Sequence, residues 1–90
     1  MSTVKIPAVL RPQAGGNREL ELPGASIREL VDGLVAQYPA LKGQLLTDEG
    51  ELNRFVNVYV NGQDVRYLAG LATEVGERDE VRLLPAMAGG

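Results

Sequence analysis

The chain has 90 residues, of which 44% are apolar and 23% charged, and its net charge is −3 at neutral pH. This length predicts a single domain, and the acidic balance argues against a nucleic-acid-binding protein, which usually presents a basic face. The sequence contains no cysteine and no histidine, which excludes disulfides, the common zinc sites and catalysis by a thiolate or an imidazole.

The first two segments alternate apolar and polar residues, which is typical of strands. Residues 4–10 follow this pattern, and so do residues 18–22. The segment between them, residues 12–17, contains a Gly-Gly pair and predicts a turn. We therefore expect an N-terminal hairpin. Pro7 cannot donate a hydrogen bond to a neighbouring strand, so it should lie at an edge or a bulge.

A helix is predicted after Pro23-Gly24 and should end before Pro39. Ser26 and Glu29 have the spacing of a capping box, in which each side chain satisfies a backbone N–H. An apolar stripe at helical spacing follows: Ile27, Leu30, Val31, Leu34, Val35 and Tyr38. Gly33 inside this helix costs about 1 kcal/mol relative to alanine, and close packing of the helix on a sheet would account for it.

Short elements and one clear strand follow the helix. Residues 41–46 predict a helical turn, and residues 47–53 predict a polar loop. The strand spans residues 54–60, in which alternation puts two sets of side chains on opposite faces. One set is Val56, Val58 and Val60, and the other is Phe55, Asn57 and Tyr59.

The remaining elements are a turn, a short strand and a final strand. Asn61-Gly62 is a strong hairpin-turn signal, and residues 63–66 could return as a short strand. The final strand is expected at residues 80–84 and ends at Pro85. Its alternation places Val81 and Leu83 inward and Arg82 and Leu84 outward.

A hairpin, one helix and then further strands is the order of the β-grasp fold. We therefore expect an α+β, ubiquitin-like domain, with a mixed sheet of four to five strands and one main helix. The domain should span residues 1–85 and act as a monomer when free. Residues 86–90 should form a flexible tail, because they are small or flexible and follow a proline that ends a strand.

The sequence offers little for catalysis or for membrane contact. Asp48, Glu49 and Glu51 cluster, but their polar surroundings indicate a solvated loop, so we do not expect an enzyme. No apolar run approaches the roughly 20 residues that span a bilayer. The segment Met1–Lys5 lacks the apolar stretch of a secretory signal, which favours a cytoplasmic protein.

The dipeptide Gly89-Gly90 is the most informative feature of the sequence. Glycine has no Cβ, so such an end fits a channel too narrow for side chains. The tail Ala86, Met87, Ala88, Gly89 and Gly90 would extend about 16–18 Å at roughly 3.3–3.6 Å per residue. It is therefore long enough to enter the active site of another protein. The alternative is a frayed terminus, as at most chain ends.

The segment 73–90 resembles the ending of the ubiquitin-like sulfur carriers, the ThiS/MoaD family. In these proteins a turn rich in Gly and Asp leads to a strand, a proline and Gly-Gly. Segments 6–16 and 54–73 are similar to the branch of the family that serves actinobacterial cysteine synthesis. Arg78 is a departure, since the family usually has glycine before the aspartate. If that turn requires a positive φ, Arg78 would be strained.

The resemblance implies a function in sulfur transfer. An E1-like adenylating enzyme and sulfurtransferase would activate the Gly90 carboxylate with ATP, and a sulfur donor would displace AMP to leave a thiocarboxylate. A PLP-dependent cysteine synthase would accept the sulfur, and a zinc metallopeptidase would release cysteine. ATP, PLP and zinc would belong to these partners, and the chain itself would bind no cofactor stably.

The resemblance also implies a partner-binding face. It places an apolar contact residue at Leu84, beside Pro85, and Pro7, Phe55 and Tyr59 could extend the patch. An exposed apolar patch rimmed by charge suits a transient interface. Alternatively, Phe55 and Tyr59 are half-buried sheet residues. Three arginines, Arg54, Arg66 and Arg82, either steer acidic partners or are solvated edge charges.

Other functions stay open. Within the family, the chain could be the small subunit of molybdopterin synthase or a sulfur donor for thiamine or another metabolite. A protein modifier joined to lysines through Gly90, like ubiquitin, is a third possibility. The fourth is a β-grasp interaction module with an inert tail.

Overall fold

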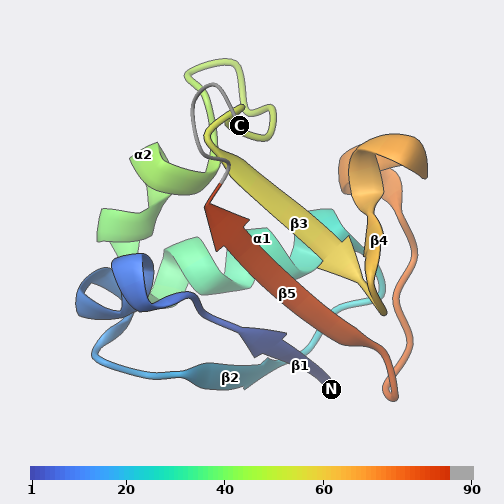
Figure 1. Cartoon of the computed structure of the whole chain (residues 1–90), viewed down its shortest axis with the longest axis horizontal. Coiled ribbons are helices and arrows are strands. Elements are labelled where there is room, and N and C mark those ends of the chain that lie inside the picture. Colours follow the sequence, from blue (N-terminus) through green and yellow to red (C-terminus); the bar gives the residue numbers. More distant parts are fainter. Residues whose placement is uncertain (86–90) are drawn as a thin grey trace.

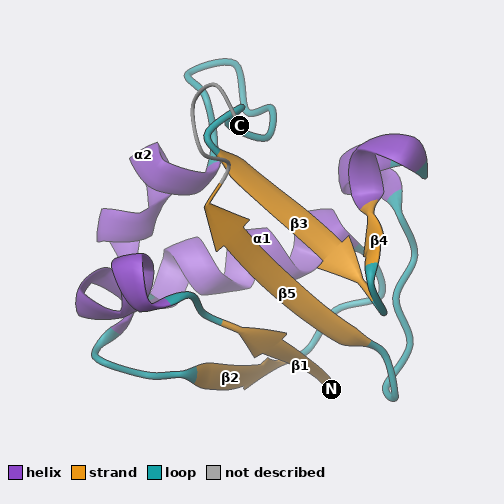
Figure 2. Cartoon of the chain, viewed as in Figure 1, coloured by secondary structure: helices purple, strands orange, loops and turns teal. Residues whose placement is uncertain are grey.

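Five strands form one mixed sheet in the order β2–β1–β5–β3–β4, and α1 crosses one face of this sheet (Figure 1). The computed structural model describes residues 1–85, and the tail residues 86–90 lie outside the described part. The strands are β1 (Ser2–Lys5), β2 (Glu19–Leu22), β3 (Val56–Val60), β4 (Gln63–Asp64) and β5 (Glu80–Pro85). The helices are α1 (Ile27–Gln37) and the short α2 (Lys42–Leu45). Figure 2 shows how shorter helical turns occupy the connections.

The central strands β1 and β5 run parallel, and every other neighbouring pair is antiparallel. The expected N-terminal hairpin is present, with Val4 opposite Leu20 in its register. The last strand, β5, lies between β1 of the first hairpin and β3, so it is the central strand of the sheet. The prediction of a β-grasp fold, with a mixed sheet of four to five strands and one main helix, is confirmed, and the sheet has five strands.

The core lies between α1 and the sheet. Alternate residues of the central strands point into it, as predicted for Val56, Val58, Val81 and Leu83. The predicted stripe of α1 faces them, and four of its six residues are fully buried: Ile27, Leu30, Val31 and Leu34. The void left between helix and sheet is only about 10 Å³, which is too small for a bound ligand.

The start of α1 is capped, in a form slightly different from the predicted capping box. The Ser26 Oγ accepts a hydrogen bond from the Glu29 N–H at 3.3 Å, as expected. The Glu29 carboxylate instead accepts from the N–H of Ala25, at 3.2 Å, one residue before the cap. The Ser26 side chain therefore satisfies the Glu29 N–H of the first turn, and the Glu29 side chain satisfies the N–H of Ala25 just before the helix.

The first strand is shorter than predicted, which is a correction to the sequence analysis. It ends at Lys5, and residues Ala8–Ala14 form a 3₁₀-helix. Pro7 is the N-cap of this helix, because its carbonyl accepts a hydrogen bond from the Leu10 N–H at 3.0 Å. Leu10 and Ala14 are buried by helical spacing, whereas Val9 is exposed.

The second half agrees more closely with the prediction. Residues Pro39–Leu41 form a 3₁₀ turn that leads into α2, where a helical turn was expected. The predicted short return strand is reduced to β4 and continues as a 3₁₀ turn, Val65–Tyr67, capped by the Asp64 carboxylate. Within residues 1–85, no helix is both long and apolar enough to cross a membrane.

Gly33 has no packing role, contrary to the expectation of close contact with the sheet. A Cβ built at this position would meet no atom within 4 Å outside its own helix. The replacement Gly33→Ala should therefore stabilise the protein by about 0.5–1 kcal/mol, because alanine loses less backbone entropy in a helix. Urea unfolding measures the change.

The matched control for this replacement is Gly24→Ala. Gly24 has a φ of +152°, and its Cβ would approach the Cβ of Glu29 to 3.0 Å. This second alanine should destabilise the protein. Equal changes in the free energy of unfolding for the two replacements would contradict the conclusion that Gly33 has no packing role.

The turn before β5 is held by Asp79, and Arg78 is not strained. Among the described residues with a side chain, only Asn61 has a positive φ, of 51°. The Asp79 carboxylate accepts from the Gly76 N–H at 2.7 Å and from the Asn61 Nδ2 at 2.9 Å. The backbone bond from Gly76 and then the bond from Asn61 hold the pKa of Asp79 below its usual value.

This lowered pKa makes one contribution to stability dependent on pH. The Asp79 contribution should be complete above the carboxyl's ordinary pKa and should be lost as the pH falls through the lowered value. Asp79→Asn should therefore destabilise the protein at neutral pH, and the difference from wild type should shrink in acid. Thermal unfolding of both proteins between about pH 7 and pH 2 tests this. A difference that stays constant over that range would contradict it.

Candidate interaction face

The face of the sheet opposite α1 carries the outward side chains of the central strands. On β5 these are Arg82 and Leu84, which alternate with the buried Val81 and Leu83. The strand register places Arg82 between Lys5 of β1 and Tyr59 of β3, and it places Leu84 beside Asn57. This face therefore combines apolar and cationic groups close to the residue where the described chain ends.

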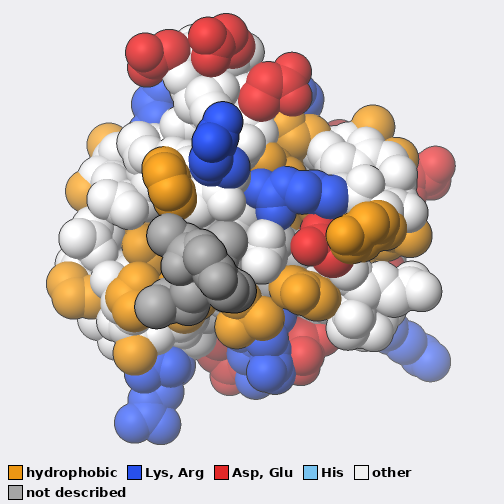
Figure 3. All heavy atoms as spheres, turned by 45° about the horizontal axis from the view of Figure 1, so that its top comes forward, with side chains coloured by type: hydrophobic (Ala, Val, Ile, Leu, Met, Phe, Trp, Pro, Cys, Tyr) orange, Lys and Arg blue, Asp and Glu red, His pale blue; other side chains and the backbone are white. Residues whose placement is uncertain are grey.

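The predicted face residues occupy different settings on this surface. Leu84 is 36% exposed and Phe55 is 63% exposed, so both offer apolar surface to solvent. Tyr59 is half-buried in the sheet, which is the alternative that the sequence left open for it. Pro85 is half-buried at the end of β5, paired with Val56 of β3. Figure 3 shows hydrophobic and basic side chains together on the side of the molecule that this view presents.

Leu84 and Pro7 line one open groove of about 470 Å³, although they are far apart in sequence. Phe55 and Tyr59 do not line it. The other lining residues are Lys5, Ile6, Arg11, Arg18, Glu19, Arg82 and Leu83. The predicted tail residues Ala86, Met87, Ala88, Gly89 and Gly90 lie outside the described part of the chain.

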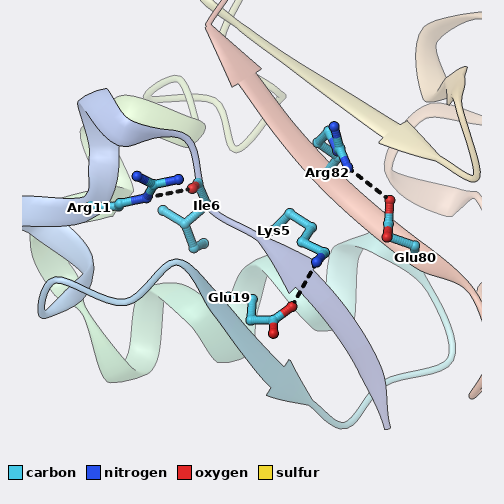
Figure 4. Close-up of polar contacts among 6 residues, drawn as sticks. All are labelled: Lys5, Ile6, Arg11, Glu19, Glu80 and Arg82. Atoms are coloured by element: carbon cyan, nitrogen blue, oxygen red, sulfur yellow. Dashed lines mark hydrogen bonds and ion pairs between the residues drawn. The ribbon is translucent and has the colours of Figure 1, made fainter.

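Four of the nine residues that line this groove are basic. Figure 4 shows the contacts of three of them. The Lys5 Nζ lies 2.9 Å from a carboxylate oxygen of Glu19. A guanidinium nitrogen of Arg82 lies 3.3 Å from a carboxylate oxygen of Glu80. The Nε of Arg11 donates to the carbonyl of Ile6 at 3.2 Å. These partners fix the positions of the cations and leave them at the surface, where each ion pair adds little to stability.

Arg11, Arg18 and Lys5 were not singled out from the sequence. They come from three separate segments, and only the parallel pairing of β1 with β5 brings them beside Arg82. Isolated basic residues in a chain of net negative charge give no signal of a cluster.

Arg66 makes three hydrogen bonds within the fold. Its guanidinium donates to the Asn57 side chain at 2.6 Å and to the carbonyls of Asn53 and Val56, each at 2.9 Å. These three bonds join the 3₁₀ turn after β4 to the start of β3. Arg66 is therefore positioned to stabilise the fold.

The acidic cluster Asp48, Glu49 and Glu51 lies exposed in the loop after α2. That loop is closed by bonds at Thr47, whose N–H donates to the carbonyl of Glu51 at 2.8 Å. Within residues 1–85, no group of three or more carboxylates forms a candidate metal site. The arrangement is that of a solvated turn.

The sheet order and the single covering helix define a ubiquitin-like protein. The chain belongs to the ThiS family, whose sequence pattern matches residues 4–90. It is 42% identical to the sulfur carrier protein CysO of Mycobacterium tuberculosis, over 98% of this chain and 97% of that protein.

Solved structures agree with this assignment. The chain superimposes on a crystal structure of the BexX/CysO complex of Amycolatopsis orientalis with a TM-score of 0.90 and 42% identity, over all of both chains. The small archaeal modifier protein 1 of Methanosarcina acetivorans is also similar. Its solution structure gives a TM-score of 0.85 at 35% identity, over 99% of this chain and 95% of that one.

Proposed function

We propose that this chain is a sulfur carrier for cysteine biosynthesis, which holds sulfur as a thiocarboxylate on Gly90. The observation that carries this proposal is the similarity to a sulfur carrier protein along nearly the whole chain, within a family match that extends to residue 90. The absence of cysteine is compatible with it, because a carrier that holds sulfur on its terminus needs no thiol.

The chemistry starts from a carboxylate, which is a poor electrophile. An E1-like enzyme would transfer AMP from ATP to the Gly90 carboxylate with release of pyrophosphate. Attack of a sulfur donor on the acyl carbon would then expel AMP and leave the thiocarboxylate. Its sulfur is the nucleophile that would add to an aminoacrylate on a PLP-dependent cysteine synthase. After an S-to-N acyl shift, a zinc metallopeptidase would hydrolyse the amide and free cysteine.

In these reactions, this chain would bind the partner enzymes and deliver its C-terminal tail to their active sites. The described domain contains no internal ligand cavity between helix and sheet, and the outward side of β5 leads directly to the tail. Partners would bind the outer face around Leu84 while the tail enters their active sites. The crystal structure of a BexX/CysO complex supports binding of this kind, since a similar protein is held there with a partner.

Reconstitution with an adenylating enzyme, ATP and sulfide tests the proposal. Intact-mass spectrometry should detect the exchange of one oxygen for sulfur in the full chain, and the product should then form a cysteine adduct with the synthase and O-phosphoserine. Sulfur exchange without a cysteine adduct would support the carrier and overturn the cysteine pathway. No exchange with an active enzyme would overturn both.

A protein modifier is the second candidate, favoured by the similarity to the small archaeal modifier protein 1. Trypsin cleaves after Arg82, so a lysine joined to Gly90 would retain the segment 83–90 as a branch. Peptides that carry this branch in cells that express the chain would support the modifier function. Their absence under conditions that yield the thiocarboxylate would argue against it.

A further inference from the structure

The groove beside Leu84 concentrates positive charge in an acidic protein. Four of the nine basic residues line it, Lys5, Arg11, Arg18 and Arg82, against a single carboxylate, Glu19. The whole chain has a net charge of −3, so this grouping runs against the overall balance. A cluster of one sign in a concave site raises the local concentration of ligands of the opposite sign.

The register of the strands adds a second observation. Lys5 and Arg82 lie directly beside each other on the parallel strands β1 and β5. Like charges on neighbouring strands destabilise a sheet, and here each is offset only by one acidic residue at the surface, Glu19 or Glu80. Within the described residues, the Arg18 side chain has no ion pair. The groove therefore holds more cationic groups than its own carboxylates satisfy.

We propose that this groove docks an extended acidic segment of a partner protein, in which carboxylates pair with Arg11, Arg18 and Arg82 and an apolar residue contacts Pro7 and Leu84. Within the domain, Arg82 already pairs with the Glu80 carboxylate at 3.3 Å, and the neighbouring Lys5 pairs with Glu19 at 2.9 Å. The apolar lining from Pro7 and Leu84 suits a peptide side chain. A polyphosphate would bring more negative charge against Glu19 and would leave this lining unused.

The inference rests on the proposed function only in that a carrier must dock on its partners. No sulfur chemistry is needed to test it, so its failure can be told apart from failure of the carrier proposal. The probe is an acetylated and amidated peptide of four glutamates around one leucine, added to the ¹⁵N-labelled full chain at low salt. The backbone amides of residues 5, 6, 11, 18, 19 and 82–84 should shift, and added salt should weaken binding.

Variants give the residue-level test. Arg18→Gln should lower the affinity for the peptide about twofold to fivefold, and Arg18→Gln with Arg82→Gln should lower it about tenfold, as expected for exposed ion pairs. Both side chains are exposed, so the variants should fold. The matched control is Arg28→Gln, an exposed arginine on α1, across the sheet from the groove, which should leave the affinity unchanged.

Three results would overturn the proposal. Equal losses for Arg18→Gln and Arg28→Gln would show that binding follows net charge alone. Shifts spread over the whole surface would exclude a defined groove. Tighter binding of ATP or pyrophosphate than of the peptide, at the same amides, would make the groove a phosphate site.

Discussion

Removal of Gly90 is expected to leave the domain folded and to abolish the conversion of its end into a thiocarboxylate. The core side chains belong to residues 4–83, and glycine has no side chain to bury, so the free energy of unfolding should change by less than about 0.5 kcal/mol. The new carboxylate would fall short of the old position by about 3.3–3.6 Å. A displacement of about 1 Å can already cost a hundredfold in rate.

Gly90→Ala tests the same end without changing its length. A Cβ should obstruct a channel that admits only glycine, so thiocarboxylate formation should be severely slowed. The measurement pairs thermal unfolding of each variant with intact mass after incubation with adenylating enzyme, ATP and sulfide. A large fall in melting temperature would show that the end of the chain packs on the domain. Normal sulfur exchange by either variant would contradict the role of Gly90.

The elements that hydrophobic periodicity predicted correctly are those whose burial follows a single period. The stripe of α1 and the alternation of β3 and β5 were read directly from the sequence, because each packs one face on the same core. The same reliance on a single period made the predicted first strand too long. Ala8 and Leu10 continue a period of two, but a 3₁₀-helix follows Pro7, and it leaves Ala8 exposed while it buries Leu10 and Ala14.

The site was less predictable than the fold. The outward position of Leu84 followed from the inward positions of Val81 and Leu83, since a strand alternates strictly. The basic groove did not, because its members meet only when β1 pairs with β5 and the 3₁₀-helix folds back beside them. Arg66 shows the converse: an arginine on a short strand looked like a surface charge, and its three hydrogen bonds depend on the later path of the chain.

Leu84→Asp is expected to weaken partner binding far more than folding. Leu84 is 36% exposed on the outer side of β5, so the free protein can solvate a carboxylate there. The cost to folding should be about 1 kcal/mol, because aspartate is a poor strand residue. Against an apolar pocket of a partner, an unpaired carboxylate carries a desolvation cost of several kcal/mol. Binding to the adenylating enzyme or the synthase should therefore fall by at least about a hundredfold.

Two further leucines supply matched controls for the same replacement. Leu68 is 46% exposed after the 3₁₀ turn that follows β4, so Leu68→Asp should leave both folding and partner binding near wild type. Leu83 is only 1% exposed, so Leu83→Asp should unfold the domain. Thermal unfolding and titration against the partner enzyme give both quantities for each variant. If Leu84→Asp unfolds like Leu83→Asp, Leu84 belongs to the core. If it folds and binds like Leu68→Asp, partners dock on another surface, and the outer face of β5 has no part in their recognition.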